Sequence, residues 1–350
     1  MDRQELPVRQ LGFRHTPVFR SLTALLGSLL LVPVLRAEPA NDLLVIEHMR
    51  EVLSGDLSSA LANARRFSDA RGREFVNELT DMARGSYATT GNRSYQWLAP
   101  LWQAAQTQHI NQYPVASGRL PLQVLSLSSQ TRSVLIVDTS QSVARLLQHQ
   151  AAGWVLRHSA YVSVGSAGVG KQKRWDRKTP LGVFELQPEQ DVSRLPARYG
   201  ARVLPLNYPT ALDRHLGRTG DGIWLHGIDP ANNIRPPRDT DGCIALDNKQ
   251  IGLLAELLES GTSLVIVATD LTWQPSSMRS PLLGDIRVHL ADYLRAERID
   301  ANANDADVVL ADATEGIWLT RVHRKNKNPL TIYWQRVNDH WQAIVASDRG

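Results

Sequence analysis

The chain contains a single cysteine and, shortly before it, a histidine that could act as its base. Both lie in the segment IWLHGIDPANNIRPPRDTDGCIAL, where His226 ends one predicted strand and Cys243, seventeen residues later, opens another. An ordinary cysteine thiol is mostly protonated at neutral pH, so a nucleophilic cysteine needs a base or a cation within hydrogen-bond reach. A loop between two strands can fold back and bring both side chains together. The spacing therefore indicates nucleophilic catalysis, with an inert buried cysteine as the alternative.

Glycines adjoin both candidate residues. Gly227 follows the histidine and Gly242 precedes the cysteine. A residue without a side chain next to a nucleophile lets backbone N–H groups approach a developing oxyanion. The glycines therefore fit the same catalytic interpretation.

Short β-branched runs surround these residues and predict a β-rich domain over 117–270. The runs are SVLIVD, YVSVG, GVFEL, GIWLH, CIAL and SLVIVA, separated by Gly, Pro and Asp turn signals. One amphipathic helix is predicted from about Asn248 to Glu259.

Flanking regions extend this domain on both sides. Residues 41–116 are helix-like, with apolar residues recurring on one face. Residues 281–350 predict an amphipathic helix followed by a three-stranded antiparallel meander, GIWLTRVHRK, LTIYWQRV and HWQAIVAS. The predicted fold class is therefore α+β.

The first 37 residues have the order of a signal peptide: arginines, a short apolar run, then RAEPA. We predict cleavage near Ala37 and a periplasmic protein, with an uncleaved N-terminal membrane anchor as the alternative. This segment holds five of the 39 basic residues and two of the 35 acidic ones, so the remaining chain is nearly neutral. With no basic cluster interleaved with aromatics, we predict no nucleic-acid partner.

Metal-ligand spacing is not found among the histidines, and the lone cysteine cannot form an internal disulfide. We therefore predict neither a metal nor another cofactor.

At this point the residues resemble the L,D-transpeptidase catalytic domain family, called YkuD-like. Its motif has His-Gly, a loop of similar length, then Ser/Thr, His, Gly and Cys. A second block, VSVGSAGVGKQKRWDRKTPLGVFEL, is similar to the family's segment that ends in Thr-Pro-x-Gly-Val-Phe. The resemblance spans about Val134 to Asp270, and the positions that match are His226, Gly227, Thr240, Gly242 and Cys243 in the first block and Gly170, Lys171, Asp176, Thr179, Pro180, Gly182 and Phe184 in the second.

The resemblance implies acyl transfer on peptidoglycan stem peptides. The thiolate of Cys243 would attack the carbonyl between a diamino acid and D-Ala, leaving a thioester. His226 would be the general base, the N–H groups of Gly242 and Cys243 the oxyanion donors, and Gly227 would orient the imidazole through its carbonyl.

Two positions depart from the family pattern. Asp241 stands where the motif has His, and a carboxylate there would raise the thiol pKa. It is either a solvent-facing loop residue or an orienter of His226, and a non-His residue here also resembles the cell-shape members of the family. Ala245 stands where many relatives carry Arg or Asn suited to a substrate carboxylate.

Other side chains could supply the missing substrate contact. Arg235 and Arg238 lie in the loop and could grip a carboxylate, unless they are solvated loop charges. We also assign Lys171 and Trp224 to substrate binding, with core packing as the alternative for Trp224.

Three functions fit these observations. The thioester could pass to an amine, as in an L,D-transpeptidase, or to water, as in an L,D-carboxypeptidase. The third is a non-catalytic peptidoglycan-binding scaffold whose flanking regions bind a wall-associated protein. The C-terminal region faintly resembles the curved-sheet end of an NTF2-like module.

Overall fold

The computed structural model describes residues 39–67, 69–83, 97–230, 234–278 and 280–348. The predicted signal peptide, 1–37, lies outside the described residues, and the alternative of a membrane anchor lies outside them too. None of the helices in the described ranges combines the length and apolar character needed to span a bilayer. The predicted α+β fold class is confirmed, and the predicted region boundaries stay predictions.

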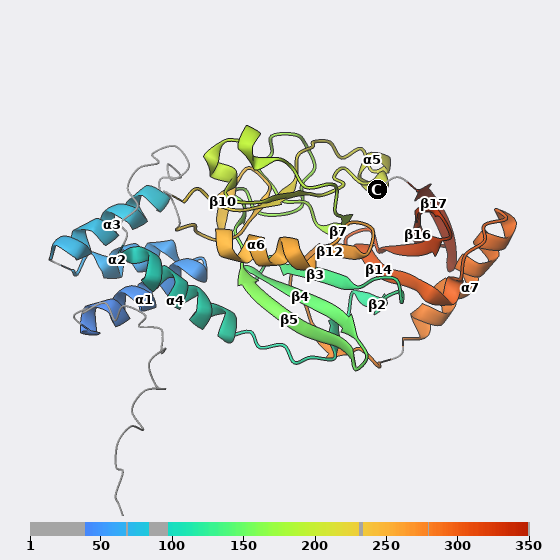
Figure 1. The fold of residues 1–350 in the computed structure, drawn as a ribbon, viewed down its shortest axis with the longest axis horizontal. Coiled ribbons are helices and arrows are strands. Elements are labelled where there is room, and N and C mark those ends of the chain that lie inside the picture. Colours follow the sequence, from blue (N-terminus) through green and yellow to red (C-terminus); the bar gives the residue numbers. More distant parts are fainter. Residues whose placement is uncertain (1–38, 68, 84–96, 231–233, 279, 349–350) are drawn as a thin grey trace, which may run out of the picture. The chain divides into compact units, whose positions relative to one another are not determined.

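Helices come first along the described chain (Figure 1). Their apolar residues meet in one core, which includes Met49, Phe75, Leu79 and Trp102. The side chain of Asp56 caps the second helix by accepting a hydrogen bond from the Ser59 N–H at 3.0 Å. The helices are α1 (Pro39–Leu53), α2 (Leu57–Ala64), α3 (Ala70–Ala83) and α4 (Leu98–Asn111).

A five-stranded sheet with the order β5-β4-β3-β12-β7 follows the helices. Strands β3 and β12 run parallel to each other. Every residue of β3 is buried, because both faces of the sheet are covered. Leu135 and Val137 enter one core, whereas Val134 and Ile136 enter another. The strands are β3 (Ser133–Asp138), β4 (Val143–Gln150), β5 (Gly153–Tyr161), β7 (Gly182–Glu185) and β12 (Ser263–Ala268).

The first of these cores lies between the central sheet and a smaller sheet that carries the candidate site. The smaller sheet has the order β11-β9-β8. Helix α6, labelled in Figure 1, belongs to the same core, to which it contributes Ile251 and Leu254. The elements are β6 (Val164–Gly165), β8 (Val203–Pro205), α5 (Ala211–His215), β9 (Trp224–His226), β10 (Arg238–Thr240), β11 (Ile244–Ala245) and α6 (Asn248–Leu257), with 3-10 turns at Val192–Arg194 and Ala197–Tyr199.

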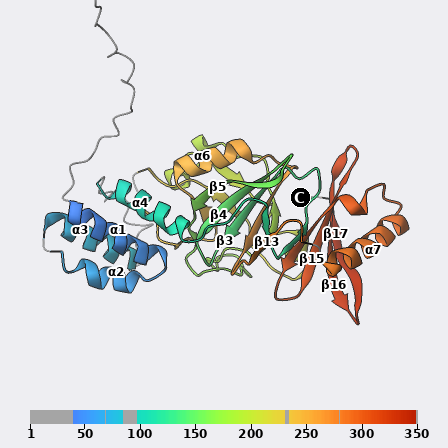
Figure 2. The ribbon, with the colours of Figure 1, turned by 90° about the horizontal axis from the view of Figure 1, so that it is seen from below.

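The second core lies between the central sheet and a C-terminal sheet with the order β17-β16-β15-β14-β2. Helix α7 packs against this C-terminal sheet through Ile286 and Leu290 (Figure 2). The elements are β1 (Arg119–Pro121), β2 (Val124–Ser126), β13 (Trp273–Pro275), α7 (Pro281–Ala296), the 3-10 turn Ala303–Asp305, β14 (Ala306–Asp312), β15 (Ile317–Arg324), β16 (Lys327–Val337) and β17 (His340–Ser347).

The C-terminal sheet is larger than the predicted three-stranded meander. β14 precedes the meander and pairs with β15, and β2 joins the sheet from a distant part of the chain by pairing with β14. β1 likewise pairs with β13. These pairings join residues far apart in sequence, so local hairpin signals do not reveal them.

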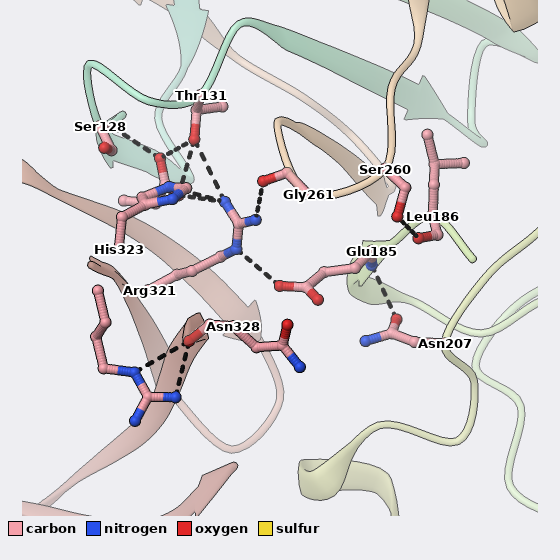
Figure 3. A network of polar contacts seen from close by, with 12 residues as sticks. Ser128, Thr131, Glu185, Leu186, Asn207, Ser260, Gly261, Arg321, His323 and Asn328 are labelled. Carbon is pink, nitrogen blue, oxygen red and sulfur yellow. Dashed lines mark hydrogen bonds and ion pairs between the residues drawn. The ribbon is translucent and has the colours of Figure 1, made fainter. Parts of the chain in front are cut away.

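A buried charge cluster ties the C-terminal sheet to the central one (Figure 3). Arg321 is 1% exposed, and its Nε lies 2.7 Å from Glu185 Oε1 on β7. A second guanidinium nitrogen lies 3.1 Å from Asp307 Oδ2, and the third donates to Gly261 O at 2.6 Å. Charges removed from water need such partners, so the cluster holds the two sheets in one arrangement.

Arg321→Ala is expected to lower the free energy of unfolding by about 3 kcal/mol, because it leaves Asp307 buried without its cationic partner. Urea unfolding measures the change. Arg336→Ala, which removes an exposed ion pair with Asp339, is the control and should cost below about 1 kcal/mol. Equal losses in both variants would contradict the role given to the cluster.

Candidate active site

The parallel pairing of β9 with β11 places the predicted nucleophile and base on one face of the smaller sheet. The register aligns His226 with Ala245. Continued back by two residues, it brings Cys243 beside Trp224. Cys243 stands one residue before β11. Since alternate residues of a strand share a face, this register predicts that Cys243 and His226 lie on the same side, with their backbones roughly 8 Å apart by standard sheet geometry.

The His226 imidazole is fixed in one tautomer. Its Nδ1 lies 2.5 Å from Gly227 O, and because a carbonyl only accepts, Nδ1 must carry the hydrogen. This is the contact that the orienting role of Gly227 requires, and it leaves Nε2 as an acceptor. The pKa of His226 is lowered to about 4, mainly by burial and then by the nearby cations Arg235 and Arg198, against the opposing effect of the hydrogen bond to Gly227. The imidazole is therefore neutral, the form of a base, at neutral pH.

The Cys243 thiol is also neutral in this structure. It donates a hydrogen bond to Gly222 O at 3.3 Å. Its pKa is raised to about 11, first by burial and then by the Asp241 carboxylate, against an opposing hydrogen bond from the Trp224 backbone. The site therefore holds a neutral thiol and a neutral imidazole, and not a preformed ion pair.

Two threonines fix the backbone at the nucleophile. Thr179 Oγ1 donates to Gly242 O at 2.9 Å, and Thr240 Oγ1 donates to Cys243 O at 2.7 Å. Gly242 has a φ of +127°, and a Cβ there would lie 2.7 Å from Lys178 O, so glycine is required. Its N–H donates to Thr240 Oγ1 at 3.1 Å. To serve as the predicted oxyanion donor, this N–H would have to be shared between Thr240 Oγ1 and the oxyanion.

The backbone at the base is fixed by Asn248, the first residue of α6. Asn248 Oδ1 accepts from the N–H groups of Ile228 at 3.2 Å and Ala201 at 2.9 Å, and Nδ2 donates to Ile228 O at 2.7 Å. A Cβ on Gly227 would lie 2.1 Å from Asn248 Oδ1. Sequence reasoning missed Asn248, because locally it reads as an ordinary helix start.

The two predicted loop arginines differ in their surroundings. Arg235 Nη1 lies 3.6 Å from Asp239 Oδ2 and donates to Asp239 O at 3.3 Å, so this end of its guanidinium is engaged. Arg238 is exposed at the start of β10. Residues 231–233 of the same loop lie outside the described ranges. The substrate role of both arginines stays a prediction.

The remaining predicted residues are placed as follows. Asp241 is exposed, and since Gly227 O occupies the Nδ1 hydrogen of His226, the structure favours the solvent-facing alternative. Lys171 is buried, and its Nζ lies 2.7 Å from Asp176 Oδ1. Trp224 is half-buried.

An arginine and a tyrosine beside the site escaped the sequence analysis. The Tyr199 ring meets the imidazole of His226 edge to face at 5.2 Å and the Trp224 ring at 4.9 Å. The exposed Arg198 guanidinium lies over the Tyr199 ring and lowers the pKa of both His226 and Cys243. Both residues lie in the 3-10 turn Ala197–Tyr199, within RLPARYG, a stretch without a catalytic signature.

Comparison with known proteins identifies the domain that holds this site. Residues 132–267 match the family described as YkuD, the L,D-transpeptidase catalytic domain. Residues 132–267 therefore form an L,D-transpeptidase catalytic domain of the YkuD type. The search of curated proteins finds no match.

Several solved structures are similar to the chain at low identity. Bd1075 from Bdellovibrio bacteriovorus is 20% identical with a TM-score of 0.48, over 65% of this chain and 97% of that one. The helical cell shape determining protein Pgp2 from Campylobacter jejuni is 15% identical with a TM-score of 0.46, over 69% and 98%. An L,D-transpeptidase from Mycobacterium smegmatis is 11% identical with a TM-score of 0.26, over 39% and 58%.

Alkylation of Cys243 should be slow at neutral pH and accelerate about tenfold per pH unit up to about pH 10, because only the thiolate reacts and the thiol pKa is raised. Asp241→Asn should speed alkylation about threefold at fixed pH by removing a charge that raises this pKa. Stopped-flow alkylation measures both rates, with Asp300→Asn as the control.

A different result would point to another resting state. If Cys243 alkylates rapidly at neutral pH and loses that reactivity in His226→Ala, the resting site holds a thiolate–imidazolium pair and the neutral assignment is wrong.

Proposed function

We propose that the protein is an exported peptidoglycan L,D-transpeptidase that forms a thioester on Cys243. The observation that supports the proposal is the contact of His226 Nδ1 with Gly227 O, which leaves Nε2 free to accept a proton, on a strand that pairs with the strand directly after Cys243. We infer export from the predicted leader, 1–37. We assign the protein to the cell-shape branch of the family because Asp241 stands where the common motif has His.

The neutral pair defines how acylation would begin. The thiol leaves Gly222 O and passes its proton to His226 Nε2 as sulfur attacks the carbonyl carbon between the diamino acid and D-Ala. Because proton transfer accompanies attack, the buried site does not have to hold two separated charges beforehand. The Cys243 N–H would donate to the oxyanion.

Collapse of the tetrahedral intermediate breaks the C–N bond. His226 returns its proton to the departing D-Ala amine, and the acyl group remains on sulfur as a thioester. Arg198, exposed beside both residues, is the cation best placed to hold the D-Ala carboxylate. An amine that attacks the thioester forms a cross-link or attaches another molecule. Water would release a tripeptide, the L,D-carboxypeptidase alternative.

Incubation with a disaccharide-tetrapeptide should release D-Ala, and His226→Ala should lower kcat by about 10²- to 10⁴-fold through loss of the base. Mass spectrometry with and without an amine acceptor separates the outcomes, because dimers or exchange products indicate transpeptidation and tripeptide alone indicates carboxypeptidation. Cys243→Ala is the inactive control. If neither product forms and the Cys243 thiol is inert at every pH, the scaffold function replaces the proposal.

A further inference from the structure

The loop KQKRWDRK, residues 171–178, presents an unusual side chain to solvent. Trp175 is 83% exposed, more than any other large apolar side chain in the described part of the chain. Single exposed apolar residues are common, so exposure alone does not indicate a function. The construction of the loop and its position in the structure do indicate a function.

The loop is built to hold this ring outward. Asp176 accepts hydrogen bonds from Lys171 Nζ at 2.7 Å and from the N–H groups of Gln172 at 2.8 Å and Lys173 at 2.9 Å. Trp175, with a φ of +67°, adopts a left-handed conformation that is unfavourable for a bulky side chain. The Asp176 contacts therefore maintain a strained turn with the indole at its tip.

The base of the loop touches the backbone that holds the nucleophile. Lys178 O lies 2.7 Å from where a Cβ of Gly242 would stand. On the other side, Gln172 O accepts from Thr219 N–H at 3.0 Å, three residues before the Gly222 carbonyl that binds the thiol. A ligand seated on Trp175 would therefore lie beside the candidate active site.

Cations flank the ring. Arg174 is engaged in an ion pair with Asp221, and Lys171 with Asp176. Lys173 and Arg177 are exposed, and in the described ranges neither forms a salt bridge. An exposed aromatic ring with an available cation two residues before it and another two residues after it suits a sugar ring, which offers an apolar C–H face, joined to a group that carries carboxylates.

We propose that Trp175, with Lys173 and Arg177, forms a saccharide-stacking subsite that selects stem peptides still attached to a glycan over free peptides. The sugar ring stacks on the indole, and carboxylates of the attached peptide pair with the cations. The ligand's identity rests on the proposed function, which this subsite deepens by naming the substrate class.

Binding to the Cys243→Ala protein tests the subsite without turnover. Calorimetry measures the affinity for a disaccharide-tetrapeptide and for the free tetrapeptide. Each affinity is measured for the Cys243→Ala protein and for the same protein that also carries Trp175→Ala. Affinity for the disaccharide-tetrapeptide should fall about tenfold, and that for the free peptide less than about twofold. Trp175→Phe should retain most of the affinity, and Val288→Ala, an exposed apolar change on α7, should have no effect.

A second measurement reports direct contact. Acrylamide should quench part of the tryptophan fluorescence through Trp175, and the disaccharide-tetrapeptide should protect that part. The protection should be absent in Trp175→Ala.

The other outcomes separate this subsite from the proposed function. Equal losses for both ligands, or unchanged affinities, overturn the subsite. If Trp175→Ala weakens only the binding of the protein to phosphatidylglycerol vesicles, the subsite is also overturned, in favour of a contact with a membrane surface. If Trp175-dependent binding is seen while the wild-type protein forms no product, the subsite stands and the proposed catalytic function fails.

Discussion

The close approach of Asn248 to the backbone after His226 is the constraint on which the candidate site depends. Its amide holds Ile228 and Ala201, and the space it occupies admits only a glycine at position 227. That backbone places the Gly227 carbonyl against the imidazole, which sets the tautomer and leaves Nε2 as an acceptor. One side-chain amide thus links the start of α6 to the protonation state of the histidine.

Burial determines how the pair can react. Removing the site from water disfavours charge on both partners, so it lowers the pKa of His226 and raises that of Cys243. A thiol with a raised pKa stays protonated at neutral pH, and in the proposed mechanism it loses its proton only as it attacks the substrate carbonyl. The same neutrality makes positioning the dominant requirement, and the threonine hydrogen bonds at Gly242 and Cys243 meet it.

The two-sided burial of the central sheet connects the site to the rest of the chain. Alternate residues of β3 and β12 enter two different cores, one beneath the site and one beneath the C-terminal sheet. The Arg321 cluster adds polar contacts that are lost if the C-terminal sheet shifts. The C-terminal sheet is therefore a structural partner of the catalytic domain as well as a flanking region.

The sequence by itself determined the fold class, most of the central strands and the helix from Asn248, because periodicity is a local property. It also predicted the Cys243–His226 pair from motif spacing. Tertiary structure decided the rest. β2 and β14 pair although about half of the chain separates them, and Arg198 and Tyr199 reach the site from a stretch with no catalytic signature. It also decided that the thiol is neutral and that the Gly242 N–H already has an acceptor. Charge state and hydrogen-bond partners depend on burial and on which distant groups meet, and neither is encoded at a single position.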